Sequence, residues 1–365
     1  MVPFLDLNPA VTETRTAVDE AIARVLASGW FVLGAEVDAF EREFAAFVGA
    51  ERCIGVGNGL DAIELALRAL DVGPGDEVIV PSNTYIATWL AVSRVGAQIV
   101  PVEPDPQTFN IDPARVTDAI TPMTRAVVAV HLYGQPAGMT ALREIAAGTG
   151  IRLVEDAAQA HGAAENGRPV GGLGDVAAWS FYPAKNLGAL GDAGAVTTND
   201  ADVADRVRVL RNYGSRTKYV NEVQGVNSRL DELQAAVLRA KLPYLAEWNE
   251  RRRSVAGQYL ERLDGAGVTL PVVAPGMDPV WHLFVVRSAD RDGLRSHLAA
   301  RGVETLIHYP IPPHRQAAYA ELGMSDGAFP IAEAIHRECL SLPIGPHMTD
   351  GQVDEVVSAV RSFAT

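Results

Sequence analysis

A single lysine stands in a stretch of the chain that is otherwise apolar and rich in glycine. Lys185 is the only charged residue between positions 176 and 191, and Gly188 and Gly191 follow it closely. A solvated lysine usually lies on a polar helix face, whereas burial lowers the pKa of a lysine and frees its amine to attack a carbonyl carbon. The residue and its setting therefore predict a nucleophile that forms a Schiff base with an aldehyde.

A carboxylate follows directly after the apolar run at residues 151–155. Asp156 should be partly buried there, which is costly unless the side chain meets a cation or hydrogen-bond donors. By itself it is either the N-cap of a helix or the partner of a positive group. Together with Lys185 it favours the second interpretation, because pyridoxal phosphate pairs a lysine at its aldehyde carbon with an acidic residue at its pyridinium nitrogen.

A glycine-rich turn, Gly55-Val-Gly-Asn-Gly59-Leu60-Asp61, leads into a segment with helical periodicity. Glycines let the backbone approach an anion, and the free N–H groups of a helix N-terminus bind phosphate. The turn has neither the dinucleotide-binding spacing nor the Gly-Lys-Ser/Thr of a P-loop. A phosphate site and a purely structural turn both remain open at this point.

The elements that must position these residues are short β-branched runs, each followed by a longer helical segment. This alternation predicts a mostly parallel sheet with helices on both faces, and ligands beyond the carboxyl ends of its strands. We expect an α/β domain with a seven-stranded sheet over residues 1–245 and a smaller α+β domain over residues 246–365. Pro243 should interrupt a long helix over 229–263. The strands are expected at residues 53–56, 77–80, 97–102, 126–132, 151–155, 176–181 and 193–197.

Composition and charge exclude several classes of protein. The chain has 365 residues, 48% of them hydrophobic, and a formal net charge of −14, so we expect a globular protein that binds neither nucleic acid nor an anionic membrane surface. No apolar run is long enough to span a bilayer, and no signal peptide is recognisable. Two isolated cysteines and scattered histidines predict neither disulfides nor a metal site. We expect a cytoplasmic protein.

The chain resembles the DegT/StrS-type nucleotide-sugar aminotransferases, which have fold type I of the pyridoxal-phosphate-dependent transferases. The resemblance extends from Phe4 to Pro343. Its most specific motifs are Glu155-Asp-Ala-Ala-Gln-Ala-His161, Ser180-Phe-Tyr-Pro-Ala-Lys-Asn-Leu-Gly188 and Asn227-Ser-Arg-Leu-Asp-Glu-Leu-Gln234.

The resemblance implies a role for each matching residue. Lys185 would carry the cofactor and move protons, Asp156 would hold the pyridine nitrogen protonated, and Gln159 would face the ring hydroxyl. Tyr85 would stack on the ring, although an ordinary core aromatic is the alternative. Asn227 would reach the phosphate from the other subunit, which implies a homodimer with shared sites. The cofactor-binding residues implied are Gly59, Leu60, Tyr85, Asp156, Gln159, Ser180, Lys185 and Asn227.

The implied reaction transfers an amino group from L-glutamate to a nucleotide-linked keto sugar. Members that act on 4-keto sugars commonly have Ser-Gly-Thr where this chain has Asn58-Gly59-Leu60, which looks more like the enzymes that aminate C3 of a dTDP-3-keto-6-deoxyhexose. A 4-keto sugar, a cyclitol ketone and a regulator without turnover are the alternatives. For several of the substrate contacts a solvated loop or a surface histidine is the competing interpretation. The substrate-binding residues expected are Tyr182, Tyr213, Lys218, Tyr219, Arg229, His308 and Tyr309.

Overall fold

Seven apolar strands form the central sheet of the protein, which the computed structural model describes for residues 1–363. All neighbouring strands are parallel except for β9, which is antiparallel to both of its neighbours. The expected mostly parallel sheet of seven strands is confirmed. Its order is β1 (Arg52–Val56), β9 (Gly194–Thr198), β8 (Val176–Ser180), β5 (Arg152–Asp156), β4 (Thr124–Val130), β2 (Glu77–Pro81) and β3 (Gln98–Val102).

Helices cover both faces of this sheet, because alternate strand residues point to opposite sides and both sets are apolar. On β2, Val78 and Val80 belong to one buried cluster and Ile79 belongs to the other. One face is covered by α3 (Gly59–Ala69), α4 (Ile86–Arg94) and α7 (Ala201–Arg211). The other is covered by α2 (Ala35–Val48), α5 (Pro113–Ala119), α6 (Met139–Thr149) and α8 (Glu232–Lys241).

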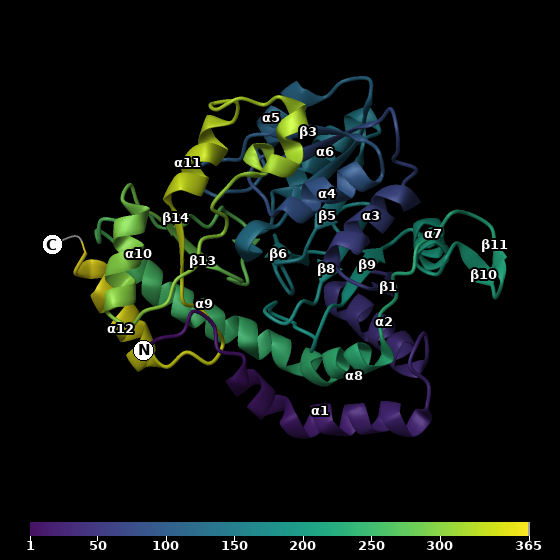
Figure 1. The fold of residues 1–365 in the computed structure, drawn as a ribbon, viewed down its shortest axis with the longest axis horizontal. Coiled ribbons are helices and arrows are strands. Elements are labelled where there is room, and N and C mark those ends of the chain that lie inside the picture. The colour runs from purple at the N-terminus through teal and green to yellow at the C-terminus, as the bar shows by residue number, and fades with distance from the viewer. Residues whose placement is uncertain (364–365) are drawn as a thin grey trace.

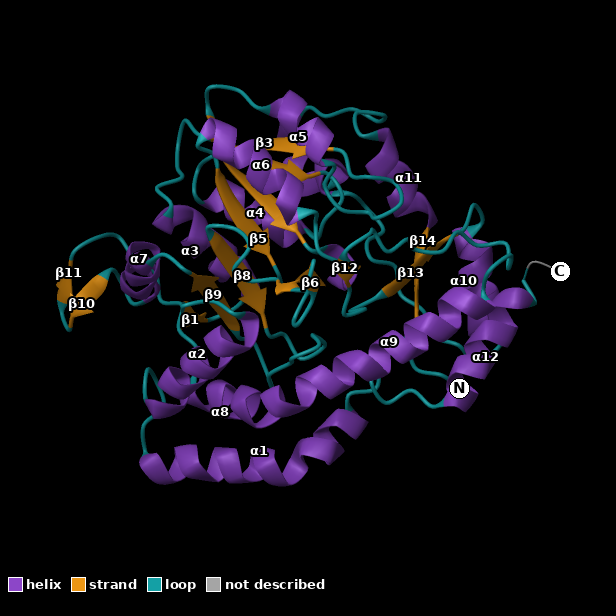
Figure 2. Ribbon diagram, turned by 180° about the vertical axis from the view of Figure 1, so that it is seen from behind, coloured by secondary structure: helices purple, strands orange, loops and turns teal. Residues whose placement is uncertain are grey.

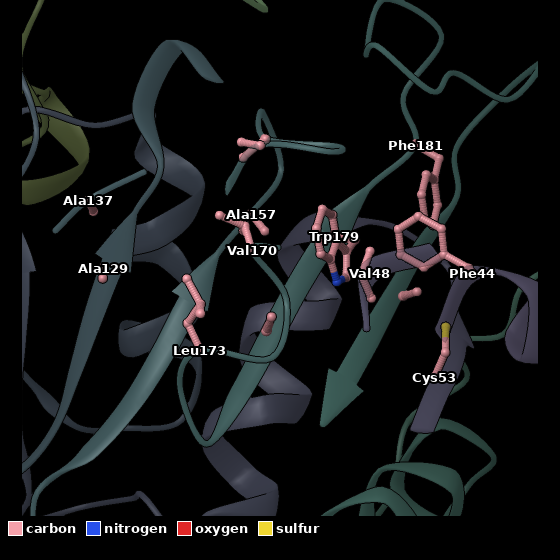
Figure 3. Packing of buried hydrophobic residues seen from close by; sticks show 14 of the residues in the cluster. Phe44, Val48, Cys53, Ala129, Ala137, Ala157, Val170, Leu173, Trp179 and Phe181 are labelled. Atoms are coloured by element: carbon pink, nitrogen blue, oxygen red, sulfur yellow. The ribbon is translucent and has the colours of Figure 1, made fainter. Parts of the chain in front are cut away.

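Aromatic residues fill the core between α2 and β8. The ring of Phe44 lies edge-on to Trp179 and to Phe181, with ring centroids 5.1 Å apart in each case, and Figure 3 shows the three side chains together. Edge-to-face contacts of this kind are favourable because the positive ring edge meets the negative face. This packing fixes the end of β8, from which the Lys185 segment departs.

Two N-terminal helices were not expected from the sequence. They are α2, described above, and α1 (Asn8–Ser28). Helix α1 lies along the outside of α8, as Figure 1 shows. Only Ala21 and Val25 of α1 join Ala236 in a small buried cluster. The apolar stripe on α1 is therefore narrow, and the helical period of its sequence is weak.

A long helical segment connects the sheet to the C-terminal part of the chain. It consists of α8, a 3₁₀ turn η2 (Leu242–Tyr244) and α9 (Leu245–Arg262). Pro243 lies in the 3₁₀ turn, which confirms the predicted interruption. Figure 2 shows α9 running away from the sheet toward the C-terminal helices.

The C-terminal part is built around a two-stranded antiparallel sheet, β13 (Phe284–Arg287) with β14 (Cys339–Leu342). Its buried cluster also contains residues of α9, α10 (Arg291–Ala300) and α12 (Asp350–Arg361), and Val2 from the N-terminus. The α+β character agrees with expectation, while the boundary at residue 245 stays a prediction. The remaining elements are β6 (Ala164–Glu165), β7 (Arg168–Pro169), β10 (Ser215–Thr217), β11 (Val220–Asn221), β12 (Met277–Asp278), α11 (Pro330–Glu338), η1 (Leu132–Gly134), η3 (Pro313–Arg315) and η4 (Ala317–Leu322).

Within residues 1–363, no helix combines the length and apolarity that a bilayer crossing requires.

Candidate active site

A cavity of about 600 Å³ opens beyond the carboxyl ends of β4, β5 and β8. Open parallel sheets bind ligands at this position. The cavity is also lined by His282, which precedes β13, and by His308 and Tyr309, which precede η3. Ten predicted site residues line it: Gly59, Leu60, Tyr85, Asp156, Gln159, Ser180, Tyr182, Lys185, His308 and Tyr309.

One end of the cavity is suited to a phosphate group. Asn58 caps α3 by accepting a hydrogen bond from the backbone N–H of Asp61 (2.9 Å). Within residues 1–363, the N–H groups of Gly59 and Leu60 make no hydrogen bond to the chain, as is usual in a first helical turn. A Cβ on Gly59 would lie 2.6 Å from the Cβ of Ser180, so the glycine allows the backbone donors and the serine hydroxyl to meet.

Asp156 ends β5 and is buried at the cavity floor. Its Oδ2 accepts a hydrogen bond from Thr88 Oγ1 (2.8 Å), and its Oδ1 accepts one from the N–H of Ala158 (3.3 Å). Burial raises the pKa of Asp156, while these two donors and the charge of Lys185 oppose the rise. The next element after Asp156 is the strand β6 and not a helix. The N-cap interpretation is therefore excluded, which leaves the interpretation as a partner for a cation.

Gln159 joins the cavity to the C-terminal part of the chain. Its Oε1 accepts a hydrogen bond from the N–H of Tyr133 (2.6 Å), and its Nε2 donates one to the hydroxyl of Tyr309 (3.0 Å). The ring of Tyr309 in turn lies 5.1 Å from the ring of Tyr85. Tyr85 is 53% exposed, which excludes an ordinary core aromatic and leaves its ring available to a ligand.

Lys185 is partly buried in the same cavity. Burial lowers the pKa of Lys185 from 10.5 to about 8, although the charge of Asp156 acts in the opposite direction. The amine is therefore far more often neutral than that of a solvated lysine, as the sequence predicted for a nucleophile.

The glycines after Lys185 allow its segment to fold back on itself. A Cβ on Gly188 would lie 2.2 Å from the carbonyl oxygen of Pro183. The buried Lys241 of α8 donates from Nζ to the carbonyl oxygen of Gly188 (2.8 Å). Close packing and this cross-link hold the segment, and so the reactive amine, in one place.

Two further predicted residues complete the rim. Tyr182 is 55% exposed. The Nδ1 of His308 lies 2.8 Å from Ser341 Oγ, and burial together with the charge of Lys185 lowers the pKa of His308 to about 4. His308 is thus a cavity wall, and the alternative of a solvated surface histidine is excluded.

Five predicted residues do not line the cavity of their own chain. Arg229 donates to Asn212 Oδ1 (3.1 Å) and lies over the ring of Tyr213. Lys218 lies over the ring of Tyr219, which is 88% exposed. Figure 1 shows the β10–β11 hairpin projecting beyond α7. Their contribution to a site, and that of Asn227 across a dimer, stays a prediction.

The structure also reveals cavity residues that the motifs did not indicate, among them Asp192 and His282, and it shows a hydrogen bond from Thr88 to Asp156. A threonine on a helix and a histidine in an apolar run carry no sequence signal of their own. Among residues 1–363, no group of three or more His, Cys, Asp or Glu side chains is arranged to hold a metal ion.

The residues present fit pyridoxal phosphate, since donors for a phosphate, a buried carboxylate and an amine with a lowered pKa share one cavity. The carboxylate and the amine line the same cavity, and each charge acts on the pKa of the other group. The N–H groups of Gly59 and Leu60 and the hydroxyl of Ser180 are the donors that suit the phosphate.

The chain is similar to known proteins over its whole length. The chain is 57% identical over 364 residues to a dTDP-3-amino-3,4,6-trideoxy-alpha-D-glucose transaminase of Streptomyces venezuelae, covering 100% of this chain and 96% of the relative. It is 54% identical over 363 residues to a dTDP-3-amino-3,6-dideoxy-alpha-D-galactopyranose transaminase of Aneurinibacillus thermoaerophilus, covering 100% and 99%.

Among solved structures, S. venezuelae DesV in complex with a ketimine intermediate matches with a TM-score of 0.98 at 57% identity, covering 100% of this chain and 98% of that one. The fold is therefore fold type I of the pyridoxal-phosphate-dependent transferases, as expected. A model of the DegT/DnrJ/EryC1/StrS aminotransferase family matches residues 13–361. The chain belongs to the DegT/DnrJ/EryC1/StrS aminotransferase family.

Proposed function

We propose that this protein is a pyridoxal-phosphate-dependent aminotransferase that moves an amino group from L-glutamate to the C3 keto carbon of a dTDP-linked 3-keto-6-deoxyhexose. The observation that carries the proposal is the joint placement of Lys185, with its lowered pKa, and the buried Asp156 in one cavity with a phosphate-binding end. A protein without turnover would not need all three features in one cavity.

When bound, the cofactor supplies an aldehyde that accepts an amine and a ring that withdraws electrons from the carbon that loses a proton. Lys185 holds and returns that proton, which an amine with a pKa of about 8 can do near neutral pH. Asp156, held by the Thr88 hydroxyl and the N–H of Ala158, would bind the ring nitrogen and keep a proton on it. Gln159 would bind the ring hydroxyl.

The 3-keto position is supported by the phosphate end of the cavity and by the relatives. Leu60 offers only its backbone N–H, whereas a threonine at this position, as in members acting on 4-keto sugars, would add a hydroxyl. Two of the similar relatives, those of S. venezuelae and A. thermoaerophilus, are named for 3-amino sugars linked to dTDP. The 4-keto sugars and cyclitol ketones remain the comparison substrates.

The amino donor, the oligomer and the compartment are parts of the same proposal. L-Glutamate is the proposed donor. A homodimer is proposed because Asn227 and the hairpin residues Lys218 and Tyr219 are exposed and do not line the cavity of their own chain, so that they could contribute to the cavity of a partner. The cytoplasm is the proposed compartment, supported by the free thiols of Cys53 and Cys339.

The test is to incubate the purified protein with L-glutamate and a panel of dTDP-3-keto, dTDP-4-keto and UDP-4-keto sugars and scyllo-inosose, reading products by mass spectrometry and NMR. We expect amination of the dTDP-3-keto sugar and production of 2-oxoglutarate. Asp156→Ala should lose most turnover, and Lys185→Ala should lose the cofactor's absorbance band after dialysis. Turnover of the cyclitol alone would overturn the substrate, and no turnover anywhere would favour a regulator.

A further inference from the structure

The cavity wall beside Lys185 carries a histidine that the reaction described above does not use. His282 precedes β13 and lines the cavity together with Lys185 and His308. Its Nδ1 lies 3.1 Å from the Oδ1 of Asn186, the residue that follows the reactive lysine in the chain. The position of the proton on this ring decides what His282 can offer to a ligand.

Two backbone carbonyl groups determine that position. Asn249 Nδ2 must donate to the carbonyl oxygen of His161 (2.8 Å), and Asn186 Nδ2 must donate to that of Val280 (3.0 Å), because a carbonyl oxygen only accepts. Asn186 Nδ2 then also donates to Asn249 Oδ1 (2.9 Å). With both amides oriented, Asn186 presents Oδ1 to His282, and the proton of the ring lies on Nδ1.

His282 is also uncharged. Burial holds the pKa of His282 well below 6.5, and the nearby charges of Lys185 and Arg252 lower it further. Arg252 is itself buried and donates to the carbonyl oxygens of Trp281 and His282. Nε2 therefore carries a lone pair and no proton.

Nothing within residues 1–363 donates a hydrogen bond to this Nε2. The atom is also not enclosed by the protein, so a ligand can reach it. It is the ring atom left for a ligand in the cavity. The wall thus offers a neutral hydrogen-bond acceptor next to Lys185.

We propose that Nε2 of His282 accepts a hydrogen bond from a hydroxyl group on a carbon next to the keto carbon of the sugar, which makes His282 a specificity residue for the keto substrate. The inference rests on the proposed function. The amino donor does not fit this role, because its amino group is the one that reacts with the cofactor and its two carboxylates are acceptors, which would face another acceptor. A keto sugar carries hydroxyl donors beside its reacting carbon.

Two substitutions separate the acceptor from the link to Asn186. The side-chain amide of His282→Gln can reach the position of Nε2 and supply an acceptor oxygen there, but it leaves Asn186 Oδ1 without its donor. The amide of His282→Asn can replace Nδ1–H and keep that link, but it does not reach the position of Nε2. The cofactor absorbance and the unfolding midpoint of both variants show whether each is folded and loaded.

The two half-reactions are then followed separately by stopped-flow absorbance of the cofactor, one with L-glutamate and one with the dTDP-3-keto sugar. For His282→Asn we expect kcat/KM for the sugar to fall by roughly a hundredfold, because a substrate hydroxyl loses its partner in a closed site, and the glutamate half-reaction to change little. For His282→Gln we expect most of the sugar half-reaction to remain.

The substrate provides a second arm. Two substrate analogues each lack one of the two hydroxyl groups beside the keto carbon. One of them should react more slowly with the wild type, by a factor similar to that expected for His282→Asn. His282→Asn should be insensitive to that same deletion, since effects of two groups in contact are not additive.

Three results would overturn the inference: full sugar activity in His282→Asn, loss of activity only in His282→Gln, or an equal slowing of the glutamate half-reaction in His282→Asn. The last two would assign His282 to holding the lysine segment through Asn186. Failure of the wild type to aminate any sugar is a separate result, which overturns the proposed function itself.

Discussion

The pKa of Lys185 can be tested in the cofactor-free protein through the rate at which its amine is chemically labelled. The pKa is lowered from 10.5 to about 8 because the group is buried. At pH 8 about half of this amine is neutral, against roughly one part in three hundred for a lysine with the ordinary pKa. Only the neutral amine reacts, so the structure predicts an excess of reactive form on the order of a hundredfold.

The assay benefits from the composition of the chain, which holds three lysines in all, Lys185, Lys218 and Lys241. Labelling with an amine-specific reagent at a series of pH values, followed by peptide mass spectrometry, gives a rate for each. Lys218 is exposed and serves as the labelled reference, whereas the buried Lys241 should react little. We expect the rate at Lys185 to level off above about pH 8.

Variants test the cause of the shift. The negative charge of Asp156 raises the pKa of Lys185, so Asp156→Asn should move the midpoint of labelling to lower pH. Asp192 lines the same cavity but does not act on this pKa, and Asp192→Asn is therefore the matched control. A rate at Lys185 that keeps rising through pH 10, or an upward shift in Asp156→Asn, would refute the reasoning.

Three more outcomes follow from single contacts. Gly59→Ala places a Cβ 2.6 Å from a side chain of β8 and should weaken cofactor binding at least tenfold in a fluorescence titration. Gly257 in α9 has open space around it, so the control Gly257→Ala should bind the cofactor normally and stabilise the protein by about 1 kcal/mol. Glu155 is buried and accepts hydrogen bonds from one side chain and three backbone N–H groups, which hold its pKa below 4.5. Glu155→Gln should lower the free energy of unfolding in urea at pH 7 by about 3 kcal/mol. The stabilisation by the carboxylate is lost as pH falls through its lowered pKa, so the difference between wild type and variant should shrink in acid. Thr88→Val removes a donor to Asp156, so the pKa of that carboxyl should rise further and cofactor affinity should fall; unchanged affinity would contradict the role of the contact.

The sheet was predictable because its strands are apolar on both faces and therefore appear as continuous runs in the sequence. The strand-end residues followed from the sheet, since Asp156 and Ser180 end neighbouring strands β5 and β8. The helix α1 was not predictable in the same way, because its buried stripe is narrow and its residues Ala21 and Val25 pack on Ala236 of α8, more than two hundred positions along the chain. Tertiary contact, and not local periodicity, defines such a helix.

The role of Asp156 illustrates how the structure decides between alternatives that the sequence leaves open. A carboxylate after a strand is compatible with a helix cap or with a cation partner, and local sequence does not separate them. The donor that orients it, Thr88, comes from α4 on a different strand–helix unit. The choice therefore depends on a contact that exists only after the sheet has assembled.

His282 shows the limit of motif-based reasoning most clearly. In the sequence it is one polar residue in Trp281-His-Leu-Phe-Val, a run typical of a buried strand, and such a histidine is usually a satisfied core residue. Its Nδ1 is satisfied, as that interpretation requires, yet the amides that satisfy it leave Nε2 as a bare acceptor on the cavity wall. A chemical property of the site thus arises from hydrogen bonds among Asn186, Asn249 and the carbonyl groups of His161 and Val280, which lie in four segments that no local motif connects. Specificity carried in this way is visible only where proton positions can be assigned from the whole network, which is why the paired His282→Gln and His282→Asn substitutions are its appropriate test.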